Sequence, residues 1–530
     1  MFIPLTPVRF LYRAMDLFAN RLGIVCGEKR LTYGQFGERA CRLANSLIKL
    51  GVKRGDRVAY LSFNTHHLME GYYGVVMAHG IVMPINVRLS PIELTAILNH
   101  SGASILLFEA DFAPLAAHLK ASCPALRHLI GIDGPSEGAS MTAEELYSTG
   151  EADRVDFMAI DEMSIAELFY TSGSTGTPKG VSLSHRTIYL HAVNVALLVY
   201  RDISTIVDLH TIPLFHANGW GKPQASVLNA THQVMVRRFE PVSVLKIIAA
   251  ERATDMSMVP TMANAILNCP ELGKHDTSTL KQIMIGGAAA SPELIQRLEA
   301  AFNCEVVAGY GLTETSPVAS TGRKKPTVTY PNEIERYRRQ SMAGWAANGV
   351  EIRVVDLDGK DVPKDMEAIG EVIIRGDHVM EGYYKEPEAT AGVIKDNWFH
   401  SGDMAIWDTG NYIHIVDRKK EIIISGGENI SSIEVEKAIY AHPAVYECAV
   451  VAAPDPKWGE VPAAIVVLKP GSNLTHDELM LFLEQRLGRF KLPRIIEFSE
   501  EQLPKTGTGK IRKNVLKERF WQGKEKRVQG

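Results

Sequence analysis

A segment rich in glycine and hydroxyl groups carries the sharpest chemical signal in the sequence. Residues 170–180 read Tyr-Thr-Ser-Gly-Ser-Thr-Gly-Thr-Pro-Lys-Gly and lie between two apolar stretches that are typical of strands. Backbone amides and hydroxyls of such a loop can surround phosphate oxygens, and Lys179 adds a positive charge. The spacing is not that of a P-loop, and a plain hairpin turn needs neither so many hydroxyls nor a lysine. The residues predicted to bind phosphate are Thr171, Ser172, Gly173, Ser174, Thr175, Gly176 and Lys179.

The whole string resembles the signature loop of the adenylate-forming superfamily, which includes acyl-CoA synthetases, peptide-synthetase adenylation domains and beetle luciferases. Further strings match that family in its order and span most of the chain. They are residues 286–292, 308–315, 401–403 with 417–418, and 504–513. The chain is therefore identified as a member of this superfamily, and the roles below are those that the resemblance implies.

The resemblance implies a nucleotide site for ATP. Tyr310 would stack on adenine, Thr313 would contact the α-phosphate, and Glu314 would help to hold Mg²⁺. The residue types agree, because an aromatic face binds a purine and a carboxylate oxygen suits Mg²⁺ shared with phosphates. Asp403 would accept hydrogen bonds from both ribose hydroxyls, and Arg418 would contact ribose and phosphate. The small residues expected to border the nucleotide are Gly287, Ala288, Ala289, Gly309 and Gly311.

The C-terminal part of the chain is implied to serve both halves of the reaction. Lys510 is the expected catalytic lysine, placing its ammonium between the reacting carboxylate and the α-phosphate. Lys420 is the expected hinge about which a mobile domain rotates between adenylation and transfer to coenzyme A. Ser425, Gly426 and Gly427 would then pack against the pantetheine arm.

The acyl pocket is expected around residues 214–221. The residues assigned to it are Phe215, His216, Trp220, Gly287 and Gly311. No cation in this segment is evident to pair with a second carboxylate, and the neighbouring Val259, Met262 and Ala263 are apolar. The sequence therefore favours a hydrophobic monocarboxylic acid, and the resemblance favours a medium-chain fatty acid. An aromatic or alicyclic acid such as benzoate, a carrier protein as acceptor, and a silent ATP-binding module stay open as alternatives.

The elements that must position these residues alternate between short apolar strands and helices. Strands are expected over residues 105–108, 256–259 and 282–285, with helices between them. This alternation predicts an α/β fold with parallel sheets, in which helices cover both faces of each sheet. Thr32 is expected to cap a helix over residues 33–50, and Ser291 another.

Strands of period two after residue 345 predict a small β-barrel or a small separate sheet. Between Gly344 and Asn348, Trp345-Ala346-Ala347 departs from the family pattern. A charged stretch at residues 417–421 suggests the domain boundary. The expected domains are residues 1–418, an adenylation domain with the ATP and acyl sites, and residues 419–530, a mobile α+β domain carrying Lys510.

Composition excludes several classes of protein. The chain has 530 residues, 46% of them hydrophobic, and a net charge of −4, which provides no general attraction for nucleic acid. Six cysteines without a CxxC pair favour the reducing cytoplasm over a disulfide framework. No stretch is long and apolar enough to predict a membrane span. Besides the acid and coenzyme A no partner is predicted, except that a homodimer stays open.

Overall fold

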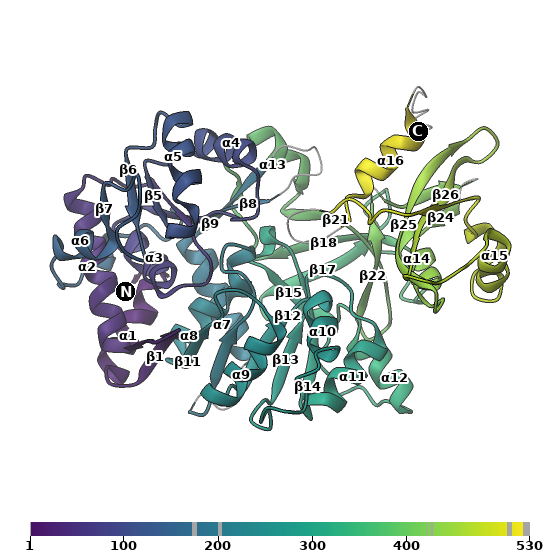
Figure 1. Ribbon diagram of the computed structural model, residues 1–530, viewed down its shortest axis with the longest axis horizontal. Helices are drawn as coiled ribbons and strands as arrows, with labels where there is room; N and C mark the ends of the chain where they lie inside the picture. The colour runs from purple at the N-terminus through teal and green to yellow at the C-terminus, as the bar shows by residue number, and fades with distance from the viewer. Residues whose placement is uncertain are drawn as a thin grey trace. The chain divides into compact units, whose positions relative to one another are not determined.

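The computed structural model describes residues 2–171, 178–199, 204–419, 421–425, 428–505 and 511–522 (Figure 1). The chain divides into two compact units. The first comprises residues 1–352, 373–400 and 409–413, and the second comprises residues 353–372, 401–408 and 414–530. No helix in the described ranges has both the length and the apolar character needed to cross a membrane.

An eight-stranded sheet of the first unit has the order β19-β9-β8-β4-β3-β5-β6-β7. Its strands are β3 (Arg57–Leu61), β4 (Ile81–Pro84), β5 (Ile105–Phe108), β6 (His128–Gly131), β7 (Met141–Thr142), β8 (Ile165–Thr171), β9 (Lys179–Ser184) and β19 (Gly382–Tyr383). The strands from β8 to β7 run parallel, as predicted, whereas β9 is antiparallel to β8 and to β19. Every residue of β5 is buried, because both faces of a parallel sheet are covered.

A nine-stranded sheet of the same unit has the order β16-β15-β14-β13-β12-β10-β11-β1-β2. Its strands are β1 (Leu22–Cys26), β2 (Lys29–Thr32), β10 (Val207–His210), β11 (His232–Met235), β12 (Asp255–Met258), β13 (Gln282–Ile285), β14 (Glu305–Gly311), β15 (Val318–Thr321) and β16 (Trp345–Ala346). The five strands from β14 to β11 are parallel to one another, with β1 also parallel to β11.

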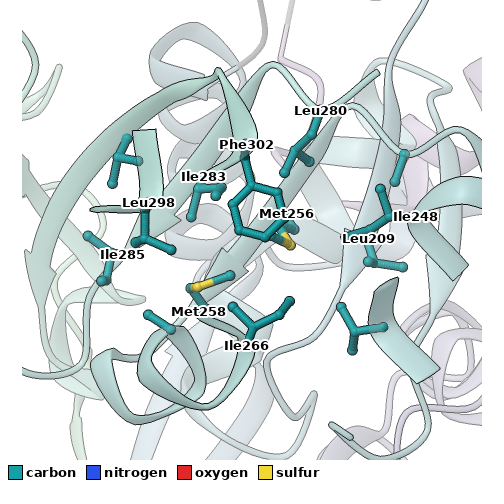
Figure 2. Close-up of a cluster of buried hydrophobic side chains, with 14 of the residues drawn as sticks. Leu209, Ile248, Met256, Met258, Ile266, Leu280, Ile283, Ile285, Leu298 and Phe302 are labelled. Carbon is teal, nitrogen blue, oxygen red and sulfur yellow. The ribbon is translucent and has the colours of Figure 1, made fainter. Parts of the chain in front are cut away.

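The two faces of the nine-stranded sheet differ in polarity. Figure 2 shows one face, where Met256 and Met258 of β12 lie with Ile283, Leu298 and Phe302 in an apolar core. Helices α9 (Pro241–Glu251), α10 (Pro260–Leu267) and α11 (Pro292–Phe302) contribute to this core. Side chains alternate along a strand, so the other face carries the buried polar residues Asp208, His210, Gln233, Asp255 and Ser257.

The remaining helices of the first unit are set by local signals as well as by packing. They are α1 (Val8–Phe18), α2 (Tyr33–Lys49), α3 (His66–Met77), α4 (Pro91–Ser101), α5 (Ala113–Ser122), α6 (Ala143–Ser148), α7 (His185–Val199), α8 (Lys222–Leu228), α12 (Glu333–Gln340) and α13 (Pro387–Val393). Thr32 caps α2 in a capping box with Gln35, and Ser291 caps α11 by accepting from the Leu294 amide. Both predicted caps are confirmed.

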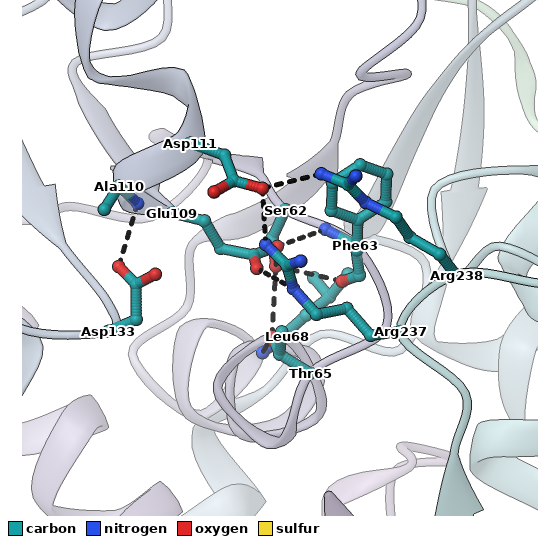
Figure 3. Close-up of polar contacts among 10 residues, drawn as sticks. All are labelled: Ser62, Phe63, Thr65, Leu68, Glu109, Ala110, Asp111, Asp133, Arg237 and Arg238. Carbon is teal, nitrogen blue, oxygen red and sulfur yellow. Dashed lines mark hydrogen bonds and ion pairs between the residues drawn. The ribbon is translucent and has the colours of Figure 1, made fainter. Parts of the chain in front are cut away.

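A buried carboxylate joins separate segments of the first unit (Figure 3). Glu109, which follows β5, accepts hydrogen bonds from the Phe63 amide at 2.6 Å and the Ser62 hydroxyl at 3.1 Å. The Arg237 guanidinium, beyond β11, reaches the same carboxylate at 2.6 Å. The network therefore ties the eight-stranded sheet to the nine-stranded sheet.

The strands predicted after residue 345 form a five-stranded sheet, one of the two arrangements expected there. Its order is β17-β18-β21-β20, with β22 beside β21. Its strands are β17 (Val350–Val355), β18 (Gly370–Gly376), β20 (Ile394–Lys395), β21 (Trp398–Trp407) and β22 (Ile413–Arg418). The indole of Trp345, in the segment that departs from the family pattern, donates a hydrogen bond of 2.8 Å to the Arg323 carbonyl.

The C-terminal part of the second unit is α+β, as predicted. Its sheet has the order β24-β23-β26-β25, with β27 parallel to β26. The elements are β23 (Ile423–Ser425), β24 (Glu428–Ile430), α14 (Ser432–Tyr440), β25 (Val445–Asp455), β26 (Gly459–Leu468), α15 (His476–Glu484), β27 (Ile495–Ser499) and α16 (Lys513–Trp521). Alternating residues of β26 enter two apolar clusters, one on each face of the sheet.

Candidate active site

The predicted phosphate loop connects two paired strands. Thr171 ends β8 and lies opposite Lys179, the first residue of β9, while Tyr170 pairs with Gly180. The predicted residues Ser172, Gly173, Ser174, Thr175 and Gly176 lie outside the described residues. The antiparallel register nevertheless brings Thr171 and Lys179 to the same end of the sheet, at the two ends of the loop.

Glu314 lies close to the lysine that follows this loop. The hydroxyl of Tyr383 donates a hydrogen bond of 2.9 Å to Oε1 of Glu314, and Lys179 Nζ lies 4.8 Å from the centre of the Tyr383 ring. The Glu314 carbonyl also accepts a hydrogen bond of 2.8 Å from the Met380 amide. The structure therefore brings two predicted residues, Lys179 and Glu314, together around Tyr383.

Sequence reasoning missed Tyr383. It belongs to β19, which pairs with β9 so that Tyr383 lies opposite Val181. No motif marked this residue, because the strand is two residues long and follows Lys179 by about two hundred residues in the chain. Only the sheet order places it beside the loop.

The ends of β13 and β14 form a closely packed border of small residues. A Cβ on Gly286 would lie 2.9 Å from the Gly309 carbonyl oxygen and 3.2 Å from the Trp220 ring. A Cβ on Gly311 would overlap the Pro317 carbonyl. Glycine is therefore required at these two positions by close backbone approach. The predicted Gly287, Ala288 and Ala289 follow on the surface, and Tyr310 and Thr313 lie at the end of β14 and in the short helix η4 (Thr313–Thr315).

The predicted acyl residues lie around a left-handed turn. Phe215 and Trp220 are buried and His216 is half-buried. The segment η3 (Ala217–Gly221) has positive φ at all five residues, between 45° and 71°. For L-residues other than glycine this conformation costs about 1–2 kcal/mol each, somewhat less for asparagine. The turn therefore persists only because its surroundings hold it.

Trp220 is brought to the predicted nucleotide border by this turn. Its ring lies 3.2 Å from a Cβ position on Gly286 and 3.6 Å from one on Gly287. The adjoining Gly221 packs against the His191 ring, where a Cβ would overlap the imidazole. Burial lowers the pKa of His191 well below its usual range, so the ring is neutral and its Nε2 accepts the Val318 amide at 3.0 Å.

Two of the three apolar residues that neighbour the expected acyl pocket contribute to the core of the nine-stranded sheet. Ala263 belongs to the apolar core under the nine-stranded sheet, and Met262 packs against that core. Val259 is the exception, because its Cγ1 lies 3.1 Å from a Cβ position on Gly287. Helix α10, which carries Met262 and Ala263, turns these side chains toward β12 and α11.

The predicted ribose residues meet in the second unit. Arg418 Nε lies 2.6 Å from Oδ1 of Asp403, which is buried, while the arginine side chain is half exposed. Asp403 lies on β21 and Arg418 on β22. The Asp417 carboxylate accepts the Arg418 amide at 2.7 Å. The pair is thus held at adjacent strands with the guanidinium reaching solvent.

The other predicted residues of the C-terminal part are only partly described. Lys420, Gly426, Gly427 and Lys510 lie outside the described residues. Ser425 pairs with Glu428 on either side of the two glycines. Lys505 pairs with Ile511, and the Arg512 amide donates to the Pro504 carbonyl at 2.7 Å, so the ends of the segment that contains Lys510 are close together.

Glu314 suits a magnesium ion that is held mainly by a nucleotide. In the described ranges no three histidine, cysteine or acidic side chains converge as a set of metal ligands. Mg²⁺ in nucleotide sites is commonly bound by one or two carboxylates together with phosphates and water. A single, partly exposed carboxylate oriented by Tyr383 therefore fits Mg²⁺ bound to ATP and does not fit a cage of protein ligands.

Family comparison covers most of the chain. Residues 11–384 match the AMP-binding enzyme family, and residues 434–510 match the AMP-binding enzyme C-terminal domain. The 4-hydroxybutyrate–CoA ligase 2 of Metallosphaera sedula is 35% identical over 523 residues, which cover 97% of this chain and 94% of that protein. The long-chain-fatty-acid–CoA ligase of Thermus thermophilus is 38% identical over 519 residues, which cover 96% of this chain and 95% of that protein.

Solved structures agree with the sequence relatives. The anthranilate CoA ligase AuaEII in complex with anthranoyl-AMP superposes with a TM-score of 0.86 at 25% identity, covering 98% of each chain. The family models, the relatives and the solved structure thus agree on one kind of enzyme. The chain belongs to the AMP-binding enzymes, as an adenylate-forming enzyme of the acyl-CoA synthetase superfamily.

Proposed function

We propose that the chain is an acid–thiol ligase that uses ATP to join a carboxylic acid to coenzyme A. In the first step a carboxylate oxygen attacks the α-phosphorus of ATP, and pyrophosphate leaves. In the second step the thiol of coenzyme A loses its proton and attacks the acyl carbon, and AMP leaves. The proposal rests on the meeting of Lys179, Tyr383 and Glu314 at the end of the β8–β9 hairpin.

Each candidate residue has a distinct task in this proposal. The loop after Thr171, with Lys179, binds the phosphates, and Tyr310 stacks on adenine. Asp403 is acceptor-only when ionised and suits the two ribose hydroxyls. Its ion pair with Arg418 already orients one carboxylate oxygen. Lys510 brings a positive charge to the two anions that react.

Glu314 would hold Mg²⁺ in company with the phosphates of ATP. When bound, the ion neutralises phosphate charge and favours departure of pyrophosphate. Tyr383 keeps one carboxylate oxygen of Glu314 in place.

A domain rotation would let one site serve both steps. We assign the adenylation domain to residues 1–418 and the mobile domain to residues 419–530, with Lys420 as the hinge. Ser425, Gly426 and Gly427 would cover the pantetheine arm in the second state. Ser425 and Glu428, which flank these two glycines in the chain, are paired between β23 and β24.

A hydrophobic acid of medium chain length is the proposed substrate. Phe215 and Trp220 are buried apolar side chains, and the Trp220 ring lies beside Gly286 and Gly287 at the nucleotide border. The related ligases act on acids as different as 4-hydroxybutyrate, long-chain fatty acids and anthranilate, so chain length is the point that most needs measurement. A cytoplasmic location is proposed as well, supported by six cysteines that are all free thiols.

The decisive experiment measures AMP release from ATP and Mg²⁺ with straight-chain acids of increasing length and with benzoate. Each acid is tested with and without coenzyme A. We expect strong turnover only with coenzyme A, with one range of chain lengths preferred. Best turnover with benzoate would replace the fatty acid by an aromatic acid. Slow AMP release that depends on neither coenzyme A nor the acid would refute the ligase and favour a carrier-loading enzyme or a silent relative.

A further inference from the structure

We propose that Asn64 and the buried pair Asp208–Lys222 are positioning residues that hold the left-handed turn η3, and through Trp220 set which acids bind. This inference rests on the proposed function of the Trp220 region as the acyl site. None of the motifs identified in the sequence includes Asn64, Asp208 or Lys222. All three side chains are buried in the first unit.

Asn64 holds the chain that leads into the turn. Its Nδ2 donates to the carbonyls of His210 and Ile212, both at 3.0 Å, and its Oδ1 accepts the Leu214 amide at 2.8 Å. One side chain thus satisfies three backbone groups in the segment between β10 and η3. The Tyr72 hydroxyl adds a hydrogen bond of 2.7 Å to the Leu214 carbonyl. The entry to the turn is therefore fixed from α3 and the residues just before it.

Asp208 holds the exit of the turn. Lys222, the residue after Gly221, donates from Nζ to Oδ1 of Asp208 at 2.9 Å. Ser226, one helical turn later, donates from its hydroxyl to Oδ2 at 3.1 Å. Lys222 and Ser226 share one face of α8, and both meet the same carboxylate on β10. The start of α8 is therefore attached to the polar face of the nine-stranded sheet.

The turn η3 lies between these two attachments, and three of its residues have an unfavourable backbone conformation. Ala217, Asn218 and Trp220 all have positive φ without being glycine. A turn with this strain relaxes when either end is released, because no local preference maintains it. Trp220 would then leave the positions beside Gly286 and Gly287. The buried polar contacts at the two ends thus control the position of an aromatic side chain.

The ion pair between Asp208 and Lys222 can hold the end of η3 because both charged groups are buried. A lysine and an aspartate out of water are costly to bury, and they are stable only when each has its partner and further hydrogen bonds. Removing the lysine leaves the buried carboxylate without its cation and frees the end of the turn at once. Asp208 and Lys222 therefore fix one arrangement of η3 more strictly than apolar residues of similar size would.

The test compares Lys222→Met and Asn64→Ala with Ser46→Ala. Ser46 is also buried in the first unit, and its hydroxyl donates to the Leu146 carbonyl at 2.6 Å, away from the turn. We expect each of the two positioning variants to raise the KM for the best acid about tenfold and to flatten the preference among chain lengths. The KM for ATP should stay within about twofold of wild type. Lys222→Arg should restore most of the acid preference.

A second measurement reads the tryptophan directly. Acrylamide quenching of Trp220 is obtained as the difference between each protein and its Trp220→Phe derivative. It should increase in Lys222→Met and Asn64→Ala and stay unchanged in Ser46→Ala. If Lys222→Met does not fold, Ser226→Ala removes one contact to Asp208 and keeps the ion pair, with a smaller change expected in the same direction.

Two results would overturn different claims. The positioning role would be refuted if Lys222→Met and Asn64→Ala lost stability, as Ser46→Ala does, but kept the wild-type acid preference and the wild-type quenching of Trp220. A wild-type protein that releases no AMP in response to any acid would instead refute the proposed ligase. The quenching measurement would still decide the positioning claim in that case.

Discussion

The hydroxyl of Tyr383 donates a hydrogen bond of 2.9 Å to the Glu314 carboxylate. The two residues come from η4 and β19, and Lys179, the first residue of β9, lies over the tyrosine ring. The contact fixes one oxygen of the carboxylate that we assign to magnesium.

Replacing this tyrosine should therefore change the metal dependence. We expect Tyr383→Phe to raise the Mg²⁺ concentration for half-maximal AMP release about fivefold, because a hydrogen bond to a charged group contributes roughly 1 kcal/mol or more. Tyr384→Phe removes a neighbouring hydroxyl and is the matched control. If both variants and the wild type needed the same Mg²⁺ concentration for half-maximal AMP release, Tyr383 would have no role at the metal site.

Lys510→Ala should slow the first step selectively. Loss of a cation between two reacting anions is expected to reduce pyrophosphate release about 100-fold or more. Transfer to coenzyme A from supplied acyl-AMP should be reduced far less, because the anions have by then been joined. Lys505→Ala, which removes a lysine paired with Glu447 at 2.6 Å, is the control. Equal loss of both steps in Lys510→Ala would remove this lysine from its assigned role.

Lys420→Pro should have the opposite profile. Proline restricts φ and removes the amide hydrogen, so a hinge at this residue would rotate with difficulty. Acyl-AMP should form at close to the wild-type rate, measured by pyrophosphate release in a single turnover, while thioester formation stops. Lys419→Ala removes only the neighbouring ion pair with Glu371 and should leave both steps intact. A hinge elsewhere would be indicated if Lys420→Pro formed thioester normally.

Arg237 and Arg238 should differ in their effect on stability, although both contact Asp111 (Figure 3). Arg237 also neutralises Glu109, whose side chain is only 3% exposed. Arg237→Ala leaves that carboxylate buried without its cation and should cost about 3 kcal/mol. Arg238→Ala removes an exposed contact worth less than about 1 kcal/mol. Thermal unfolding followed by calorimetry distinguishes them, and equal melting temperatures would contradict the role given to Glu109.

Glu167 should make the protein less stable as pH rises. Complete burial raises the pKa of this carboxyl to about 8, and the hydrogen bond from Gln224 at 2.7 Å opposes the shift only in part. The folded protein therefore holds a proton that the unfolded chain releases near pH 4.5, so stability falls between about pH 4.5 and pH 8. Glu167→Gln keeps the shape and cannot ionise.

The Glu167→Gln variant should accordingly have a higher melting temperature than wild type at about pH 9, and the difference should be much smaller at about pH 5. Gln224→Glu is not a suitable control, because it adds a second buried carboxyl. Ser46→Ala serves instead, since its effect should not depend on pH. A difference between Glu167→Gln and wild type that is constant over this range would mean that Glu167 is ionised throughout.

Several features were determined by the sequence itself. The hydroxyl- and glycine-rich loop, the caps at Thr32 and Ser291, and the alternation of short strands with helices follow from local chemistry, which acts between residues close in the chain. The family resemblance added the order of the motifs and correctly indicated the α/β fold and the class of enzyme. These properties depend on residue type and spacing alone.

Only the tertiary structure decided which residues surround those motifs. Tyr383 reaches Glu314 because β19 joins the edge of the eight-stranded sheet, and strand order is not visible in local patterns. Asn64 meets Leu214 across 150 residues for a similar reason.

The same limit applies to the apolar residues that neighbour the expected acyl pocket. Met262 and Ala263 are apolar, and their type does not say whether they face a substrate or a core. In the folded chain Ala263 lies in the apolar core with residues of β12 and α11, and Met262 packs against that core. The direction of a side chain is set by the packing of whole elements, and that is a property of the folded chain and not of its residue pattern.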